Sequence, residues 1–172
     1  MDTIGFVRMM ATRAHETLED AIDGLTSEQL HHREPDSAIS SIAAVYLHLA
    51  MVNDAVTQGL FQGRPPLYAS DGWAAKLGAP FQVTFDQAWA DAIRIEDAAH
   101  LRGYGQAVQA AIDDYLAHTT ATEDELDRVL ETPFGERRYG EALGRYYLIH
   151  TMQHTGEICA LKGRFGLRAL PL

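Results

Sequence analysis

The sequence predicts an all-α fold, a four-helix bundle. Apolar residues recur every three or four positions in four long stretches, which is the period of amphipathic helices. No stretch shows the strong alternation of apolar and polar residues that marks strands. With 172 residues the chain fits one domain with a substantial core, so we expect a single domain over residues 1–172.

The first long helix is expected from Thr3 to about Asp23, where Gly24 breaks the pattern. Residues 26–29, Thr-Ser-Glu-Gln, have the form of a capping box and predict one short helical turn. Residues 33–37 are expected to be a connector. The apolar stripe of the first helix consists of Ile4, Val7, Ala11, Ala14, Leu18, Ala21 and Leu25.

The second long helix is expected to begin at a cap, Ser37 or Ser40, and to end near Gln62. Glycine and proline at residues 63–66 end it. The connector that follows, residues 63–84, is rich in glycine, proline and aromatic residues. Such a long connector in a compact domain is usually functional or packed over something. The stripe of this helix consists of Ile42, Val45, Leu49, Val52, Val56 and Leu60.

The third long helix is expected to end near Thr119, after a helical region opened by a capping box at residues 84–87. A short helix from Thr122 is expected to carry Leu126, Val129 and Leu130, followed by a turn at residues 132–135 and a short extended piece at 137–140. The fourth long helix is expected over about 141–162, ended by glycines 163 and 166. Its stripe consists of Leu143, Tyr147, His150, His154, Ile158 and Leu161.

Composition and charge exclude several classes of function. The net charge is −10 and the basic residues form no concentrated patch, which argues against a nucleic-acid partner. No apolar run approaches the roughly 20 residues that cross a bilayer, so no membrane partner is expected. The N-terminus lacks the form of a signal peptide, and the lone Cys159 suits a reducing compartment, so we expect a cytoplasmic protein.

Three histidines are expected to face the interior of the bundle. The spacing of His150 and His154 puts two imidazoles on one face of a helix. Both belong to the apolar stripe. His48 lies three residues after Val45 and four before Val52, so it shares the apolar face of the second helix. Two helices therefore direct three imidazoles inward.

Two interpretations of these histidines stay open at the level of periodicity. A divalent metal on three imidazoles, with a fourth position open for water, would satisfy their lone pairs and suit catalysis. Alternatively, each ring pairs with a Tyr, an Asp or a backbone carbonyl. Glu157, on nearly the same face, either supports a ligand histidine or is solvated. The pair is not a zincin motif, because Thr151 stands where the general-base Glu would be.

The chain resembles the DinB/YfiT-like superfamily. The segment Ser41–Ala50, which contains His48, is similar to the first histidine motif of the family. The segment His150–Ile158 is similar to the second, which has the form H-x-x-x-H-x-G-[QE]-I. The tail over residues 161–171 is similar to endings in one branch of the family. The resemblance covers essentially the whole chain.

The resemblance implies an up-down-down-up four-helix bundle and a divalent metal held by His48, His150 and His154. Zinc or nickel suits such a site best, and iron, manganese or copper also fits. Members often form homodimers. Characterised relatives include thiol-dependent S-transferases and a maleylpyruvate isomerase that use bacillithiol or mycothiol, and others are labelled hydrolases. No motif for a thiol cofactor can be matched in this chain.

We therefore expect a metal-dependent enzyme, a thiol S-transferase or a hydrolase, acting on a small molecule. A low-molecular-weight thiol is a candidate cosubstrate, and no catalytic residue is assigned. The connector over residues 63–84 is expected to cover the site and set substrate choice. The alternative is a non-catalytic, dimeric bundle that binds a metal or ligand as a sensor or stress-related binding protein.

Overall fold

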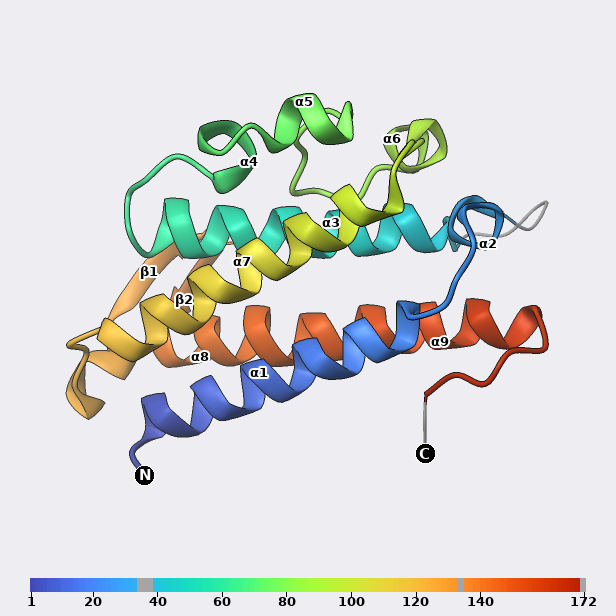
Figure 1. Cartoon of the computed structure of the whole chain (residues 1–172). Helices are drawn as coiled ribbons and strands as arrows, with labels where there is room; N and C mark the ends of the chain where they lie inside the picture. The colour runs from blue at the N-terminus through green and yellow to red at the C-terminus, as the bar shows by residue number, and fades with distance from the viewer. Residues whose placement is uncertain (34–38, 133–134, 171–172) are drawn as a thin grey trace.

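The structure, a computed structural model, describes residues 1–33, 39–132 and 135–170 and is mainly helical (Figure 1). It contains the four expected long helical segments. They are α1 (Thr3–Ile22), α3 (Ile42–Asp54) with η1 (Ala55–Leu60), α7 (Ala98–His118), and α8 (Tyr139–Leu143) with η3 (Gly144–His150) and α9 (Thr151–Arg164). The shorter elements are α2 (Ser27–His31), α4 (Leu67–Ser70), α5 (Trp73–Leu77), α6 (Gln87–Ala92), η2 (Glu123–Asp127), β1 (Val129–Thr132) and β2 (Gly135–Arg138).

Each of the long helices packs against two of the others. Both α1 and α3 contact α7 and α9, so each long helix has two long neighbours. In Figure 1, α3 and α7 lie above α1 and α9, and the β1–β2 hairpin closes one end. None of the described helices combines the length and apolar character that spanning a bilayer requires.

Helix α3 is buried on every side, which differs from the amphipathic helix that the sequence predicts. Residues outside the expected stripe, such as Ala43, Ala44 and Leu47, are as inaccessible as those in it. The connector accounts for the difference, because α4 and α6 contact α3 and lie above it in Figure 1. A helix that is apolar all round is a buried helix.

Asp54, the last residue of α3, holds the beginning of the connector in place at α4. Its carboxylate accepts hydrogen bonds from the backbone N–H groups of Leu67 and Tyr68, at 2.8 Å each, and from the hydroxyl of Tyr104 at 2.8 Å. Burial raises the pKa of the Asp54 carboxyl. Three donors offset the loss of solvation, and two of them belong to the first turn of α4, where the helix dipole favours a negative charge. The connector is thereby tied to the end of α3.

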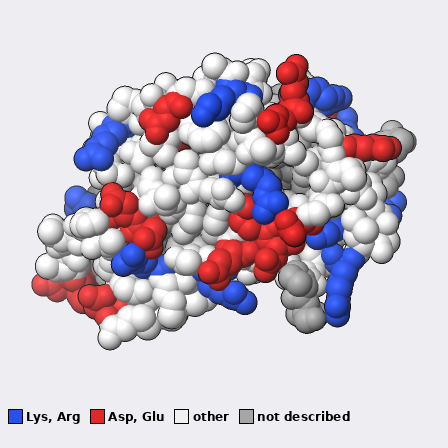
Figure 2. All heavy atoms as spheres, in the orientation of Figure 1, with Lys and Arg blue, Asp and Glu red and all other residues white. Residues whose placement is uncertain are grey.

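Ion pairs join α1 to α7 at the surface. Arg8 of α1 pairs with Asp113 at 2.6 Å, and Arg102 of α7 pairs with Glu19 at 3.3 Å and Asp23 at 3.0 Å. Figure 2 views this face and shows acidic and basic side chains interspersed on it. Exposed pairs of this kind contribute about 0–1 kcal/mol each, so they align the two helices more than they stabilise them.

Several expected boundaries are wrong or lie outside the described residues. Residues 34–37 of the expected connector, the candidate cap Ser37 among them, are not described. The cap of α3 is Ser41, whose hydroxyl accepts from the N–H of Ala44, and not Ser40. The cap of α6 is Asp86, which accepts from the N–H of Trp89, and not Thr84.

The short helix after Thr122 ends earlier than the sequence predicts. Only residues 123–127 are helical, as a 3-10 turn, and Val129 and Leu130 lie in β1. They pair there with Arg138 and Arg137 of β2. The extended piece expected at 137–140 is therefore a strand that begins earlier, at Gly135. Two residues of the expected turn, 133 and 134, lie outside the described part.

Two of the long helical segments contain π-helical stretches that the sequence pattern does not indicate. A π turn bonds residue i to i+5 and is common near functional sites. In η3 this geometry lets the adjacent residues Tyr146 and Tyr147 both be buried. The Tyr147 hydroxyl lies 2.9 Å from Oγ1 of Thr57 in η1, so the two π stretches contact each other.

Replacing Gly105 with alanine is expected to destabilise the fold. A Cβ atom there would lie 1.9 Å from the hydroxyl oxygen and 2.7 Å from Cζ of Tyr46, whose hydroxyl is bonded to Glu19. Because the added methyl group would overlap this buried ring and displace it, we expect a loss of about 1–3 kcal/mol in the free energy of unfolding, measured by urea denaturation. Gly163→Ala in α9, where no heavy atom lies within 4 Å, is the control and should be neutral or stabilising by up to about 1 kcal/mol. Equal effects of the two substitutions would contradict this account of the packing.

Candidate metal centre

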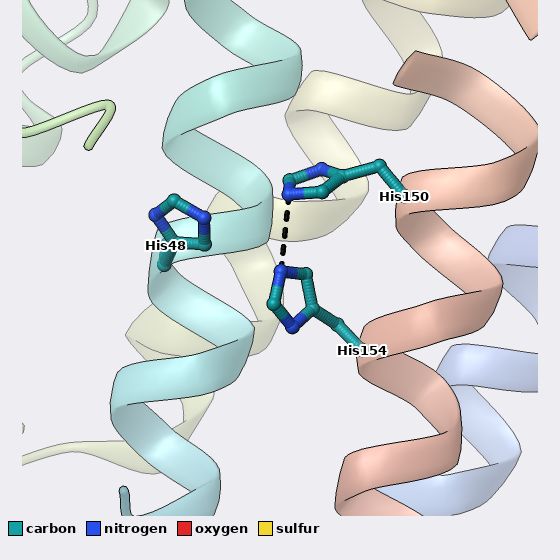
Figure 3. A group of neighbouring side chains, drawn as sticks. All are labelled: His48, His150 and His154. Carbon is teal, nitrogen blue, oxygen red and sulfur yellow. Dashed lines mark hydrogen bonds between the residues drawn. The ribbon is translucent and has the colours of Figure 1, made fainter. Parts of the chain in front are cut away.

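The structure brings together the three histidines that the sequence directs inward. His48 comes from α3, His150 ends η3, and His154 lies one turn later on α9. Figure 3 shows the three rings facing one another between these helices. One ring nitrogen from each residue lies within 4.8 Å of the others. This set has the size and the donor chemistry of a three-imidazole metal site.

Hydrogen bonds orient the two histidines of the fourth helical segment. Nδ1 of His154 lies 2.8 Å from Oε2 of Glu157, and Nε2 of His154 lies 3.0 Å from Nε2 of His150. An ionised carboxylate only accepts, so Nδ1 of His154 donates to it and Nε2 presents its lone pair to the cluster. A carboxylate behind a histidine is the usual arrangement at a metal ligand. Glu157 therefore contacts His154 rather than standing alone in solvent.

Two buried ring atoms of the cluster have no hydrogen-bond partner among the described residues. They are Nδ1 of His48 and Nδ1 of His150. Leaving such an atom unsatisfied costs about 1–3 kcal/mol. The bonds found for the three rings go to Glu157 and to another ring, and none goes to the Tyr, Asp or carbonyl that ordinary core histidines would need. Neither His48 nor His150 is therefore held at Nδ1 by a neighbouring side chain or carbonyl of the described residues.

The environment keeps two of the rings neutral. Burial, followed by the charge of the neighbouring His154, lowers the pKa of His48 to about 4 and the pKa of His150 to about 3. At neutral pH both imidazoles therefore carry free lone pairs. This is the protonation state in which histidine binds metals.

The cluster borders a cavity of about 460 Å³. His48 and His150 line it, together with the apolar side chains of Val52, Val83 and Phe85. The ring of Phe85 packs edge-on against that of His48, with 5.1 Å between centroids. Residues 63–84 are expected to cover the site. Of these, Val83 and Thr84 are the ones that line the cavity, together with Phe85 directly after them. The earlier aromatics Tyr68 and Trp73 pack on Tyr104 of α7.

Sequence reasoning missed three polar residues that also line this cavity, namely Arg137, Arg145 and Tyr146. Arg137 reaches the cavity from β2. The position of this strand depends on its pairing with β1, which a helical period does not predict. Arg145 and Tyr146 lie in η3, and a spacing of five residues brings Arg145 to the side of His150 only where the helix is π. A basic residue near a histidine motif in an acidic chain was the one indication available.

Comparison with known proteins identifies the family and a similar fold. A family model described as the DinB superfamily matches residues 10–158, which include all three histidines. A crystal structure titled as the conserved protein of a locus from Enterococcus faecalis is similar in fold, with a TM-score of 0.74 and 20% identity over 95% of this chain and 99% of that one. No curated protein matches. Because the family model spans most of the sequence, the chain belongs to the DinB superfamily.

Proposed function

We propose that this protein is a divalent-metal-dependent enzyme with His48, His150 and His154 as the metal ligands. One observation carries the proposal: two helices bring three imidazole nitrogens within 4.8 Å of one another beside a cavity. Three protein ligands leave a coordination position for water or substrate, which is typical of catalytic sites rather than structural ones. Zinc or nickel suits these donors best, with iron, manganese or copper as further candidates.

The residues around the cluster support a reaction on a small molecule. A bound divalent ion supplies a lowered pKa for water or for a thiol, which is the nucleophile that a hydrolase or a thiol S-transferase needs. Glu157 holds His154 in the orientation that points Nε2 inward. Phe85 and Val83 place apolar side chains along the cavity, and the ring of Phe85 packs against that of His48. A low-molecular-weight thiol is the proposed cosubstrate of the transferase reaction.

We also propose a single domain, the order of the four helices, and a homodimeric, cytoplasmic protein that acts on a small molecule. One hydrophobic core runs through α1, α3, α7 and α9, which supports a single domain. The contacts of α1 and α3 with the same two helices support a four-helix bundle, and the directions of the helices in Figure 1, with α1 and α9 running one way and α3 and α7 the other, support the up-down-down-up order. A homodimer, a small-molecule partner and a cytoplasmic location are proposed from the family resemblance and the composition.

The first test is the metal content of untagged protein, measured by elemental analysis and by zinc titration. We expect about one divalent ion per chain in the wild type. His150→Ala should weaken the affinity by more than about 100-fold, beyond the 10–100-fold effect of residues that only support a ligand. The exposed His118→Ala is the control and should bind as the wild type does.

The same protein should then be screened for thiol conjugation and ester hydrolysis with and without EDTA. A turnover that disappears with EDTA and with His150→Ala supports the enzyme. A tightly bound metal with a closed coordination shell and no exchangeable water would instead support the sensor or storage alternative. Absence of a stoichiometric metal and of measurable zinc affinity would sink both.

Glu157 is expected to strengthen metal binding through His154. Glu157→Ala removes the acceptor of the 2.8 Å hydrogen bond and should lower zinc affinity by about 10–100-fold. Glu157→Gln keeps a carbonyl acceptor at the same length and should lose less, which separates the orientation of the ring from the negative charge. Competition with a zinc-binding dye measures both variants. An unchanged affinity in Glu157→Ala would show that the contact is incidental.

The metal-free protein is expected to lose stability in acid through the cluster. His48 and His150 have pKa values of about 4 and 3, below the ordinary 6.5 of the unfolded chain. The unfolded state therefore binds more protons as pH falls from about 6.5 to 4, and stability falls with it, on the order of 2 kcal/mol for each ring. Urea unfolding with EDTA at pH 7 and pH 4.5 measures the difference. His48→Leu should reduce the loss, whereas His118→Ala should not, and equal losses in all three proteins would refute the assignment.

A further inference from the structure

The cavity beside the histidines has a positive lining in an otherwise acidic protein. The chain has 24 acidic and 14 basic residues, yet the charged side chains found along this cavity are Arg137 and Arg145. No Asp or Glu of the described residues lines it. The two guanidinium groups are therefore the source of positive charge at this cavity.

Of the two arginines, Arg145 is the one that is free of a carboxylate partner in the described structure and can bind an anionic ligand. Arg137 is held by Glu141, with 2.6 Å between Nη1 and Oε1. Arg145 forms no ion pair with any carboxylate in the described part of the chain, although most of the other described arginines do. Arg145 lines the same cavity as His48 and His150. An arginine without a carboxylate can bind an oxygen anion through two parallel N–H groups.

A buried hydroxyl lies next to Arg145 in sequence and borders the same cavity. Tyr146 is only 4% exposed, and its hydroxyl has no hydrogen-bond partner among the described residues. A buried hydroxyl in a folded protein normally has one. The π stretch η3 therefore presents to one cavity an unpaired guanidinium and an unsatisfied hydroxyl, immediately before the ligand candidate His150.

We infer that this cavity binds a small molecule with an anionic oxygen group, a carboxylate or a phosphate, held by Arg145. Arg137 adds a second positive charge, and the hydroxyl of Tyr146 donates a hydrogen bond to the same molecule. The inference deepens the proposed function, on which it rests, by naming the substrate class. Arg137, Arg145 and Tyr146 are positioning residues in this account.

The apolar residues that line the cavity indicate the character of the rest of the ligand. Val52, Val83 and Phe85 are apolar, so the body of the ligand packs against them while its anion faces the arginines. The volume of about 460 Å³ lies in the range of sites for small ligands. A ligand bound there lies next to His48 and His150, which line the same cavity and mark the place of the proposed reaction.

The test is calorimetric titration of zinc-loaded protein with succinate and with succinamide, its uncharged analogue. We expect succinate to bind and succinamide to bind at least about 10-fold more weakly, because only the carboxylate pairs with a guanidinium. Arg145→Gln should weaken succinate by at least about 10-fold while zinc stoichiometry and thermal unfolding stay unchanged. Tyr146→Phe should weaken it by about 3–10-fold. Arg138→Gln is the matched control, because Arg138 lies on β2 beside Arg137 but pairs with Asp127 outside the cavity.

A second titration, of metal-free protein with succinate and with inorganic phosphate, separates the two proposals and the two anions. If zinc does not bind at all but Arg145→Gln still weakens either anion, the proposed metal function fails and the anion site stands. The anion that is weakened more identifies carboxylate or phosphate as the preferred group. If Arg145→Gln leaves succinate binding unaffected in the zinc-loaded protein and leaves both anions unaffected in the metal-free protein, the inference is overturned.

Discussion

Helix α3 is enclosed by α7 and α9 within the bundle and by α4 and α6 of the connector, so all 13 of its residues are buried. A polar side chain on such a helix needs a partner inside the protein. Tyr46 has Glu19, and Asp54 has three donors from α4 and α7. His48 faces two other imidazoles instead. A fourth polar residue of this helix, Asn53, is also buried, and its Oδ1 has no partner among the described residues.

The rest of the cluster follows from how the fourth helical segment presents its side chains to α3. A line of contacts runs from Glu157 through His154 to His150 along this segment, and His48 meets it from across the bundle. A ligand bound at the three rings would connect α3 to α9. The cluster therefore draws on α3, η3 and α9, and the hairpin and η3 add Arg137, Arg145 and Tyr146 at the cavity beside it.

Local patterns in the sequence were enough to predict the four long helices and the inward direction of the histidines, because helical period and capping depend on near neighbours. The full burial of α3 was also within reach, since Ala43, Leu47 and Met51 make the helix apolar on every face. The strand at Val129 and Leu130 depends on pairing with β2, and the π stretch η3 depends on tertiary packing. Arg145 and Tyr146 therefore could not be placed at the site from periodicity.

The enclosure of α3 also has a consequence during synthesis of the protein. The residues that cover it include α9, which begins about a hundred residues after α3 ends. At about 5–20 residues per second, the ribosome adds these residues in roughly 5–20 s. During that time α3, which has no polar face, is only partly covered by the rest of the chain. The yield of soluble protein in the cell is then governed by how the nascent chain is shielded, for instance by a chaperone, as much as by the stability of the finished fold.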